Sequence, residues 1–322
     1  MKTPIKAIKD KVLAGQTITR EEALSLLQSA EPEQELFPAA SEIRELFHGK
    51  KIKICAISNA KSGKCSEDCS FCAQSAHYQT GVDIYPMKSC TALLNEVETA
   101  NKDYKVSSFG LVTSGKTILS TIELDALAET IRAYPSGVKR CASLGCLSYE
   151  QCVKLKAAGL ENLHHNLETA ASFYPKICST HSYQDRFETL KNARKAGLNI
   201  CVGGIFGLGE SLEQRVEFAF ELLDIDPVGI PLNFLSPIPG TPLADMPLLA
   251  PVDALKIIAM FRFVHPKRTL RICGGREKVM QGMHNMIFKA GADAIMTGNY
   301  LTTTGRVPAD DHKMITELGL HY

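Results

Sequence analysis

The feature that most limits the possible folds is a regular alternation of short apolar segments and longer amphipathic segments after residue 51. The short segments are rich in β-branched and other apolar residues, as expected for buried strands. These candidate strands are residues 51–58, 106–114, 138–145, 162–168, 199–208, 229–236, 270–275 and 293–298. The helical patterns between them include residues 124–131, 149–157, 186–195, 213–223 and 252–263. Eight such units in about 250 residues predict an α/β fold of the (β/α)8 TIM-barrel type, because an open doubly wound sheet rarely reaches eight.

The first fifty residues have a different pattern, which predicts an N-terminal helical extension. Thr19-Arg20-Glu21-Glu22 has the spacing of a capping box, and an apolar-periodic run follows it. We therefore expect three parts: the helical extension at residues 1–50, the barrel at 51–305 and a C-terminal tail at 306–322.

Composition excludes several classes of protein. The 322 residues are 45% hydrophobic and 22% charged, as in ordinary globular proteins. A net charge of +1 gives no field that would favour nucleic acids or acidic membranes. The chain has no apolar run long enough to span a bilayer and no signal-peptide core at its start. We expect a cytoplasmic protein, without nucleic-acid or membrane partners, whose eleven cysteines serve more as metal ligands than as disulfides.

Three of these cysteines, Cys65, Cys69 and Cys72, lie within eight residues at Cys-x3-Cys-x2-Cys spacing. Three thiolates this close can bind three irons of a four-iron cluster and leave the fourth iron without a protein ligand. Together with the aromatic Phe71 before the third cysteine, the spacing resembles that of radical S-adenosylmethionine (SAM) enzymes. That resemblance implies that the open iron binds the methionine amine and carboxylate of SAM. Because the loop follows the first predicted strand, we expect it at the active-site face of the barrel.

A structural zinc site is the alternative for this loop. Such a site needs four nitrogen or sulfur ligands, and Cys55 upstream or His77 downstream could supply the fourth. Zinc motifs usually contain two cysteine or histidine pairs, which the sequence near this loop does not provide. The alternative corresponds to a non-enzymatic binding or structural protein, whose preparation would be colourless and contain zinc rather than iron.

Residues 110–117 match the P-loop pattern G-x4-G-K-[ST]. A working P-loop needs its helix to begin at the Gly-Lys-Thr segment, so that helix N–H groups bind the phosphates. Ser120-Thr121-Ile122-Glu123 is a better helix start and lies too late for that role. We therefore do not expect nucleotide triphosphate hydrolysis, and ATPase activity that depended on Lys116 would contradict this.

Two further segments carry polar or glycine-rich patterns near predicted strand ends. Gly203, Ile205 and Glu210 belong to a G-x-I-x-G-x-x-E pattern, by which radical SAM strands approach the adenine of SAM. Glycines permit the close backbone passage that this approach requires, although any strand that enters a glycine-rich turn could look similar. Asn166 and Glu168 lie two residues apart at the end of the fourth predicted strand and could bind ribose hydroxyls.

His164 shares the face of Asn166, and it could contact substrate or simply be a buried histidine. Asn233 places another amide at the end of the sixth predicted strand. With these residues the chain resembles the biotin synthase family from about residue 40 to the C-terminus. The segments that carry the resemblance are residues 57–75, 164–169, 183–190, 203–210, 232–234, 240–245 and 270–277.

The resemblance implies that the chain inserts sulfur between two unactivated carbons of dethiobiotin to form biotin. It implies a [4Fe–4S] cluster on Cys65, Cys69 and Cys72 that cleaves SAM, a low-potential electron donor such as flavodoxin or ferredoxin, and a homodimer. Asn166 and Glu168 match ribose-binding positions, although the family more often has Asp at the second. His164 and Asn233 match positions that contact the ureido ring of dethiobiotin, where the family usually has Asn at both.

The family draws sulfur from an auxiliary [2Fe–2S] cluster held by three cysteines and an arginine. Cys141, Cys201 and Arg271 match three of these ligands, but the remaining cysteine, expected near Phe109-Gly110, is absent. Glycine cannot bind iron, so the usual cluster cannot form in the usual way.

Cys273 could compensate, because it lies two residues beyond Arg271 and should point the same way. We hypothesise that Cys141, Cys201 and Cys273 bind an auxiliary cluster of four irons, with Cys146 as a further candidate ligand. The alternatives are that Cys273 is a passive buried thiol, or that the chain is another radical SAM barrel enzyme, of the hydrogenase-maturation or amino-acid mutase type, without sulfur insertion.

Overall fold

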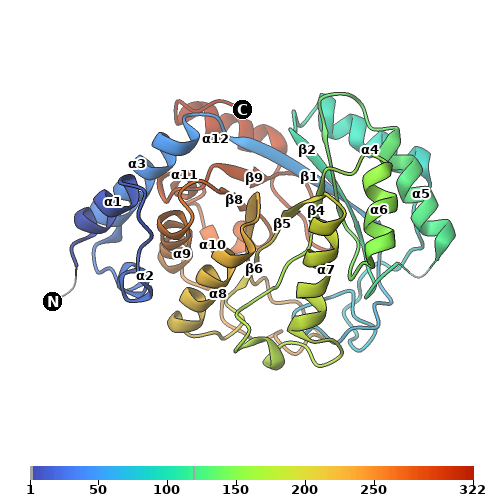
Figure 1. The fold of residues 1–322 in the computed structure, drawn as a ribbon, viewed down its shortest axis with the longest axis horizontal. Helices are drawn as coiled ribbons and strands as arrows, with labels where there is room; N and C mark the ends of the chain where they lie inside the picture. Colours follow the sequence, from blue (N-terminus) through green and yellow to red (C-terminus); the bar gives the residue numbers. More distant parts are fainter. Residues whose placement is uncertain (1–2, 119) are drawn as a thin grey trace.

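The strands of the computed structural model form one parallel ring. The structure describes residues 3–118 and 120–322 (Figure 1). Within them, the strand order is β5-β4-β3-β2-β1-β9-β8-β7-β6, and pairing of β5 with β7 closes the ring. The strands are β1 (Lys53–Lys61), β2 (Ser108–Thr113), β3 (Lys139–Ser143), β4 (Asn162–His164), β5 (Asn199–Cys201), β6 (Gly204–Phe206), β7 (Gly229–Phe234), β8 (Thr269–Ile272) and β9 (Ala294–Met296). This confirms the predicted TIM-type barrel.

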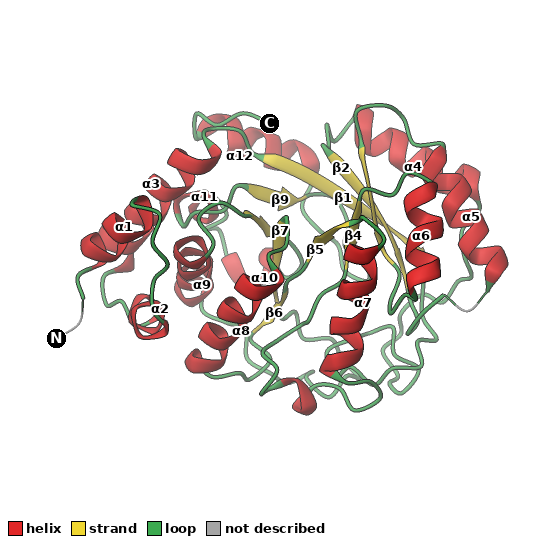
Figure 2. Ribbon diagram, viewed as in Figure 1, coloured by secondary structure: helices red, strands yellow, loops and turns green. Residues whose placement is uncertain are grey.

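Helices surround the strands on the outside of the ring, as Figure 2 shows in red around yellow. They are α1 (Ile5–Leu13), α2 (Arg20–Leu27), α3 (Phe37–His48), α4 (Cys90–Lys102), α5 (Thr121–Arg132), α6 (Tyr149–Ala157), α7 (Tyr183–Lys195), α8 (Leu212–Ile225), α9 (Pro251–Val264), α10 (Arg276–Met280), α11 (Met286–Lys289) and α12 (Pro308–Glu317). Short helical turns lie at Pro32–Leu36 and Tyr174–Lys176. Among the described helices, none has the length and apolar character needed to cross a bilayer.

The N-terminal helices pack on one side of the barrel, where α2 and α3 contact α9. The predicted capping box at the start of α2 is confirmed. The backbone N–H of Glu22 donates to Thr19 Oγ1 at 3.2 Å, and the backbone N–H of Thr19 donates to Glu22 Oε2 at 2.7 Å. These bonds satisfy two amide groups that a helix start leaves without partners.

The helix after β2 begins where the sequence predicts. Ser120 caps α5 by accepting a hydrogen bond from the Glu123 backbone N–H at 3.3 Å. The Gly115-Lys116-Thr117 segment therefore precedes the helix and does not form its N-terminus. A phosphate at this segment would lack the helix amides that a P-loop uses.

The predicted strand at residues 199–208 is wrong in one respect, because it consists of two strands, β5 and β6, separated by Val202 and Gly203. A Cβ atom at Gly203 would lie 1.9 Å from the Pro231 carbonyl oxygen, and one at Gly204 would lie 2.3 Å from the Glu168 carbonyl oxygen. Only glycine permits such close backbone contacts, and the strand is interrupted at this point. The ring closes at this break, where Cys201 pairs with Gly229.

Two other predicted strands end earlier than expected. Strand β4 stops at His164, so Asn166 and Glu168 lie in the following loop rather than in the strand. Glu168 has a φ of +68°, which strand geometry does not allow. Strand β8 stops at Ile272, and Cys273 follows it with its backbone N–H donating to the Leu232 carbonyl at 3.0 Å. Both corrections move candidate residues from strands into the loops at the carboxyl end of the barrel.

Candidate active site

A cavity of about 390 Å³ occupies the carboxyl end of the barrel and extends between the strands. The three cysteines of the loop after β1, Cys65, Cys69 and Cys72, line its outer part. A second set of thiols, Cys55, Cys141, Cys201 and Cys273, lines its inner part together with Arg271. We call the first set the loop thiols and the second set the inner thiols. Both sets therefore face one space, as an enzyme with two linked centres would require.

Backbone hydrogen bonds fold the cysteine loop into tight turns. The backbone N–H of Cys65 donates to the Gln74 carbonyl at 2.9 Å, and the backbone N–H of Cys72 donates to the Cys69 carbonyl at 2.9 Å. These turns direct the loop thiols toward the cavity. Burial raises the pKa of Cys72 to about 11, so its thiolate form is unfavourable until a cation binds it. The loop thus fits a cluster held by three thiolates.

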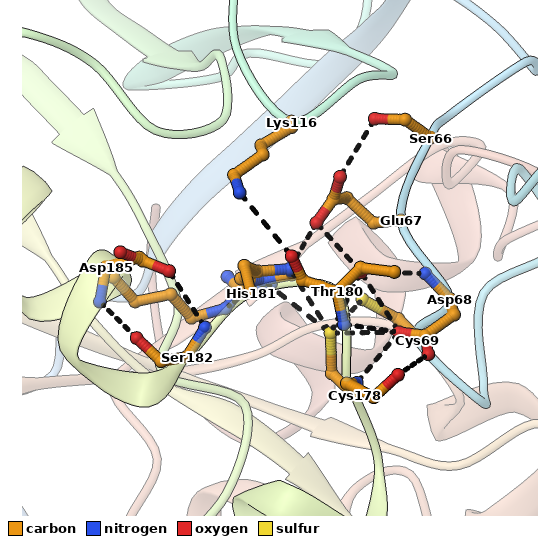
Figure 3. A network of polar contacts seen from close by, with 12 residues as sticks. Ser66, Glu67, Asp68, Cys69, Lys116, Cys178, Thr180, His181, Ser182 and Asp185 are labelled. Carbon is orange, nitrogen blue, oxygen red and sulfur yellow. Dashed lines mark hydrogen bonds and ion pairs between the residues drawn. The ribbon is translucent and has the colours of Figure 1, made fainter.

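The loop is anchored to a second segment, residues 178–181, as Figure 3 shows. Asp68 Oδ1 accepts hydrogen bonds from the backbone N–H groups of Ser179 at 2.9 Å and Thr180 at 3.2 Å. Burial opposes ionisation of Asp68, but these hydrogen bonds hold its pKa well below the usual value. Glu67 Oε2 lies 2.5 Å from His181 Nδ1 on the same segment. Sequence reasoning missed this anchor, because its two halves are far apart in the chain.

Four residues proposed for SAM binding reach the cavity: Phe71, Asn166, Glu168 and Ile205. Asn166 Nδ2 donates to Glu168 Oε2 at 3.3 Å, so the amide and carboxylate lie side by side as the sequence predicts. Arg186 NH1 lies 3.5 Å from Glu168 Oε1. Burial raises the pKa of Glu168 despite the nearby guanidinium. The pair presents an acceptor and a donor to hydroxyl groups in the cavity.

Gly203 and Glu210 have different positions. Gly203 passes close to Pro231, and Glu210 is buried in the turn that follows β6. The Glu210 carboxylate accepts hydrogen bonds from the backbone N–H groups of Gly207 at 3.0 Å and Leu208 at 2.8 Å, and from Arg215 Nε at 2.7 Å. Neither residue lines the cavity. Gly203 thus permits close packing of the chain between β5 and β6, and Glu210 stabilises the turn that follows β6.

His164 and Asn233 line the same cavity as the loop thiols and the inner thiols. Burial, and secondly the charge of Arg271, lowers the pKa of His164 to about 4, so its imidazole is neutral at pH 7. Asn233 Nδ2 donates to the Gly204 carbonyl at 3.1 Å, and Asn233 Oδ1 accepts from the Gly274 N–H at 3.0 Å. These bonds fix the amide plane where it borders the cavity.

The inner thiols come from different strands and surround Arg271. Cys55 and Cys273 pack together with Met296, and their side chains are almost fully buried. Within the described residues, Arg271 Nε is buried without a hydrogen-bond partner. Burial lowers the pKa of Arg271, but the surrounding thiols, Cys55 first, raise it above the usual value. A buried cation among thiols, with a polar atom left unsatisfied, fits a site that holds an anionic metal cluster.

Sequence reasoning missed Cys55 as an inner thiol and considered it only as a zinc ligand. The signal was strand alternation, which places Cys55 on the same side of β1 as Ile57. On the neighbouring strand, Gly110 pairs with Ile57 on one side and with Cys141 on the other. Gly110 therefore faces the inner thiols, at the position where the sequence lacks a cysteine, and Cys55 supplies a thiol from the adjacent strand.

Cys146, the other candidate ligand, lies nearer the cavity mouth. Its backbone N–H donates to the Lys116 carbonyl at 2.6 Å. Burial raises the pKa of Cys146, with lesser effects from Thr189, Arg186 and Lys116. None of these neighbours belongs to the inner thiols, whose pKa values are influenced by Arg271 instead. Its position does not favour a role as a ligand of an inner cluster.

Comparison with known proteins identifies the class first. Residues 60–222 match the family model "Radical SAM superfamily", and residues 231–321 match the "Biotin and Thiamin Synthesis associated domain". With the barrel and the three-cysteine loop, these matches define a radical SAM enzyme.

Curated relatives then define the family. The biotin synthase of Trichlorobacter lovleyi is 46% identical over 321 residues, covering 99% of this chain and 96% of that protein. The biotin synthase of Clostridium tetani is 45% identical and covers 99% of both chains. The chain therefore belongs to the biotin synthase family.

Solved structures support the fold. A crystal structure of methylornithine synthase superposes with a TM-score of 0.83 at 20% identity, covering 98% of this chain and 96% of that chain. A structure of HydG, a maturase of the [FeFe]-hydrogenase, also gives 0.83, at 18% identity, covering 98% of this chain and 74% of that chain. At such low identity these likenesses establish the barrel, not a shared reaction.

Proposed function

We propose that the chain converts dethiobiotin to biotin with two equivalents of SAM and takes the sulfur from an auxiliary cluster of four irons at the inner thiols. The observation that carries this proposal is the second group of buried thiols around Arg271, in the same cavity as the loop thiols. Membership of the biotin synthase family supplies the substrates. Family membership also supports a low-potential electron donor and a homodimer.

At the cavity mouth, Cys65, Cys69 and Cys72 would hold a [4Fe–4S] cluster. When bound, this cluster supplies the electron that cleaves SAM and so generates the radical that abstracts hydrogen from substrate. Asn166 and Glu168 would orient the ribose through hydrogen bonds to its hydroxyls. Their placement beside the loop limits where the reactive carbon can lie, and this orientation lowers the entropy cost of the reaction.

Dethiobiotin would lie between the loop thiols and the inner thiols. His164 is neutral at pH 7 and can donate or accept one hydrogen bond to a urea group. Asn233 is held rigidly by its bonds to Gly204 and Gly274, so it presents a fixed face to the same ring. These two residues would set the position of the ureido ring and thereby direct the carbon to be sulfurated toward the inner thiols.

Cys141, Cys201 and Cys273 would hold the auxiliary cluster, and we propose Cys55 as its fourth thiol. The auxiliary cluster supplies the sulfur atom. Four thiols without a cysteine at Gly110 match a four-iron cluster better than the arginine-containing two-iron set of the family. Arg271 would then stabilise the negative charge of the thiolates rather than bind iron, as its raised pKa among these thiols supports.

Anaerobic turnover tests the reaction. Protein reconstituted with iron and sulfide is incubated with dethiobiotin, SAM and a chemical reductant, and biotin and 5′-deoxyadenosine are measured. We expect both products. Formation of 5′-deoxyadenosine without biotin would contradict sulfur insertion and favour another radical SAM reaction. A preparation that contains zinc and makes neither product would contradict radical chemistry altogether.

Iron and sulfide counts test the auxiliary site. Two four-iron clusters give about eight irons per chain, and loss of all three loop thiols should leave about four. Cys273→Ala and Cys55→Ala should each lower the count, whereas Cys152→Ala, a buried cysteine of α6 outside the cavity, should not. A count near four in the unaltered chain, unchanged by Cys273→Ala, would show that no auxiliary cluster forms.

A further inference from the structure

We propose that the chain, before it carries its loop cluster, binds one thiophilic divalent cation such as Zn²⁺ or Fe²⁺ at Cys69, Cys178 and His181. The ligand atoms of these three buried residues all lie within 4.8 Å of one another. Figure 3 shows them where the cysteine loop meets the segment at residues 178–181. Two thiolates and an imidazole are a donor set that suits zinc and ferrous iron.

The spacing of the donors matches a single ion. Cys69 Sγ and Cys178 Sγ are 3.8 Å apart. Two thiolates that each bind a tetrahedral ion at about 2.3 Å would lie about 3.8 Å apart. His181 Nδ1 is 3.2 Å from Cys178 Sγ, slightly closer than a sulfur and a nitrogen on one such ion. Little movement is therefore needed to form the site.

The histidine ring is already oriented. Tyr174 Oη lies 2.8 Å from His181 Nε2 and also accepts a hydrogen bond from Arg186 Nε at 2.8 Å. In the structure, Arg186 Nε is also 3.1 Å from His181 Nε2. With an ion on Nδ1, the proton of His181 is on Nε2 and is donated to the tyrosine oxygen. Arg186 then donates to the tyrosine oxygen alone. A hydrogen bond to the far nitrogen fixes the ring of a ligating histidine and strengthens metal binding.

Two carboxylates make the surroundings favourable for a cation. Glu67 Oε2 lies 2.5 Å from His181 Nδ1, and Asp68 Oδ1 lies 3.3 Å from Cys178 Sγ. Glu67 can complete four-fold coordination once the ion replaces the proton between its carboxylate and Nδ1, because carboxylate oxygens also bind zinc. Asp68 keeps its bonds to Ser179 and Thr180 and adds negative charge nearby. Two cations oppose the ion: Arg186, whose guanidinium also lies 3.5 Å from Glu168, and Lys116, whose Nζ lies 3.5 Å from the Thr180 carbonyl oxygen.

Cys69 belongs both to this site and to the loop cluster, so the ion and the cluster exclude each other. The ion would therefore occupy the cluster-free chain and be released when the cluster is assembled. By joining the cysteine loop to the segment at residues 178–181, it would hold the loop folded in the interval. This site differs from an ion held by the loop thiols, which would need Cys65 and Cys72 instead of Cys178 and His181.

The test uses the full chain, freed of cluster and metal by chelation under anaerobic conditions. Because the inner thiols can also bind thiophilic ions, the unaltered chain and every variant are also titrated in a background in which Cys55, Cys141, Cys201 and Cys273 are replaced by serine. Co²⁺ is titrated in, sulfur-to-cobalt charge-transfer absorption is recorded, and Zn²⁺ affinity is obtained by competition. Cys178→Ser and His181→Gln should each weaken binding by at least about tenfold. Cys65→Ser and Cys72→Ser are the matched controls and should bind as the unaltered chain does. Circular dichroism confirms that each variant is folded.

X-ray absorption of the Zn²⁺-loaded, unaltered chain gives an independent answer that no folding defect can obscure. We expect two sulfur ligands, with nitrogen or oxygen completing the sphere. Three sulfur ligands, or binding that is lost in Cys65→Ser and Cys72→Ser but kept in Cys178→Ser, would place the ion on the loop thiols and overturn the proposal. Four sulfur ligands would place it on the inner thiols and would also overturn it. Failure of the unaltered chain to bind Co²⁺ or Zn²⁺ would also overturn it.

Discussion

The loop thiols and the inner thiols share one cavity but are built in opposite ways. The loop thiols come from eight consecutive residues, and short-range turns and the Asp68 anchor position them. The inner thiols come from β1, β3, β5 and the end of β8, so only closure of the barrel brings them together. The loop site is therefore formed within one short segment, whereas the inner site depends on how all the strands of the barrel are aligned.

The largest expected effect is that substitutions in the loop thiols and in the inner thiols stop different reactions. Cys72→Ala should reduce both 5′-deoxyadenosine and biotin to background, because the loop cluster loses a ligand. Cys201→Ala should abolish biotin while SAM cleavage continues, since the loop thiols remain intact. Both products are measured in one anaerobic assay. If Cys201→Ala also stopped SAM cleavage, the two groups would not be separable and the comparison would fail.

A pair of glycines tests how strictly the ring is constrained. In Gly204→Ala the added Cβ would lie 2.3 Å from the Glu168 carbonyl oxygen, which should lower the free energy of unfolding by about 3 kcal/mol. In Gly110→Ala the nearest contact is Ile57 Cγ2 at 3.3 Å, so the change should stay within about 1 kcal/mol. Urea unfolding of the cluster-free chains measures both. Equal losses would show that the break between β5 and β6 is not a special constraint.

The inner cavity should respond to acid through His164. Its pKa is about 4 in the folded chain, chiefly because of burial, and about 6.5 in an unfolded chain. Between these values the unfolded chain binds more protons, so stability falls as the pH drops from about 6.5 toward 4, by at most about 1.4 kcal/mol per unit. His164→Asn removes this titration and keeps a polar side chain that can form hydrogen bonds. Unfolding of both cluster-free chains at several pH values should therefore give a flatter profile for the variant, and parallel profiles would contradict the assignment.

The smallest expected effect concerns the loop. Asp68→Asn keeps the size of the side chain but removes the charge that accepts hydrogen bonds from Ser179 and Thr180. We expect the cluster-free chain to lose about 1 kcal/mol of stability and to take up its loop cluster more slowly. Iron binding at the inner thiols should be unchanged. Slower filling of both sites would mean that the anchor supports the whole barrel.

What the sequence predicts well follows from local patterns. The barrel, the capping box at Thr19, the N-cap at Ser120 and the positions of the loop thiols depend on periodicity, capping chemistry and spacing within a few residues. These interactions are complete within short segments, so the chain around them cannot easily change them.

What the sequence misses depends on contacts between distant segments. The inner position of Cys55 follows from its register against β2 and β9, and the contact of Cys69 with Cys178 joins residues more than a hundred positions apart. Glu210 is a related case: the pattern suggests a SAM-binding segment, and the hydrogen bonds of its carboxylate to backbone N–H groups of the same turn could not be read from the spacing. Sequence spacing does not show which polar side chains will form hydrogen bonds with the backbone.

The interruption between β5 and β6 has a mechanical consequence. Strand β5 closes the barrel through the pairing of Cys201 with Gly229, directly before this interruption. A cluster bound by the inner thiols would link β5, where the barrel closes, to β1, β3 and the end of β8. It would therefore cross-link strands on different sides of the barrel. The protein–iron bonds of such a cluster would be the thiolate bonds, so replacing one inner cysteine would free its strand from this link and weaken the barrel there.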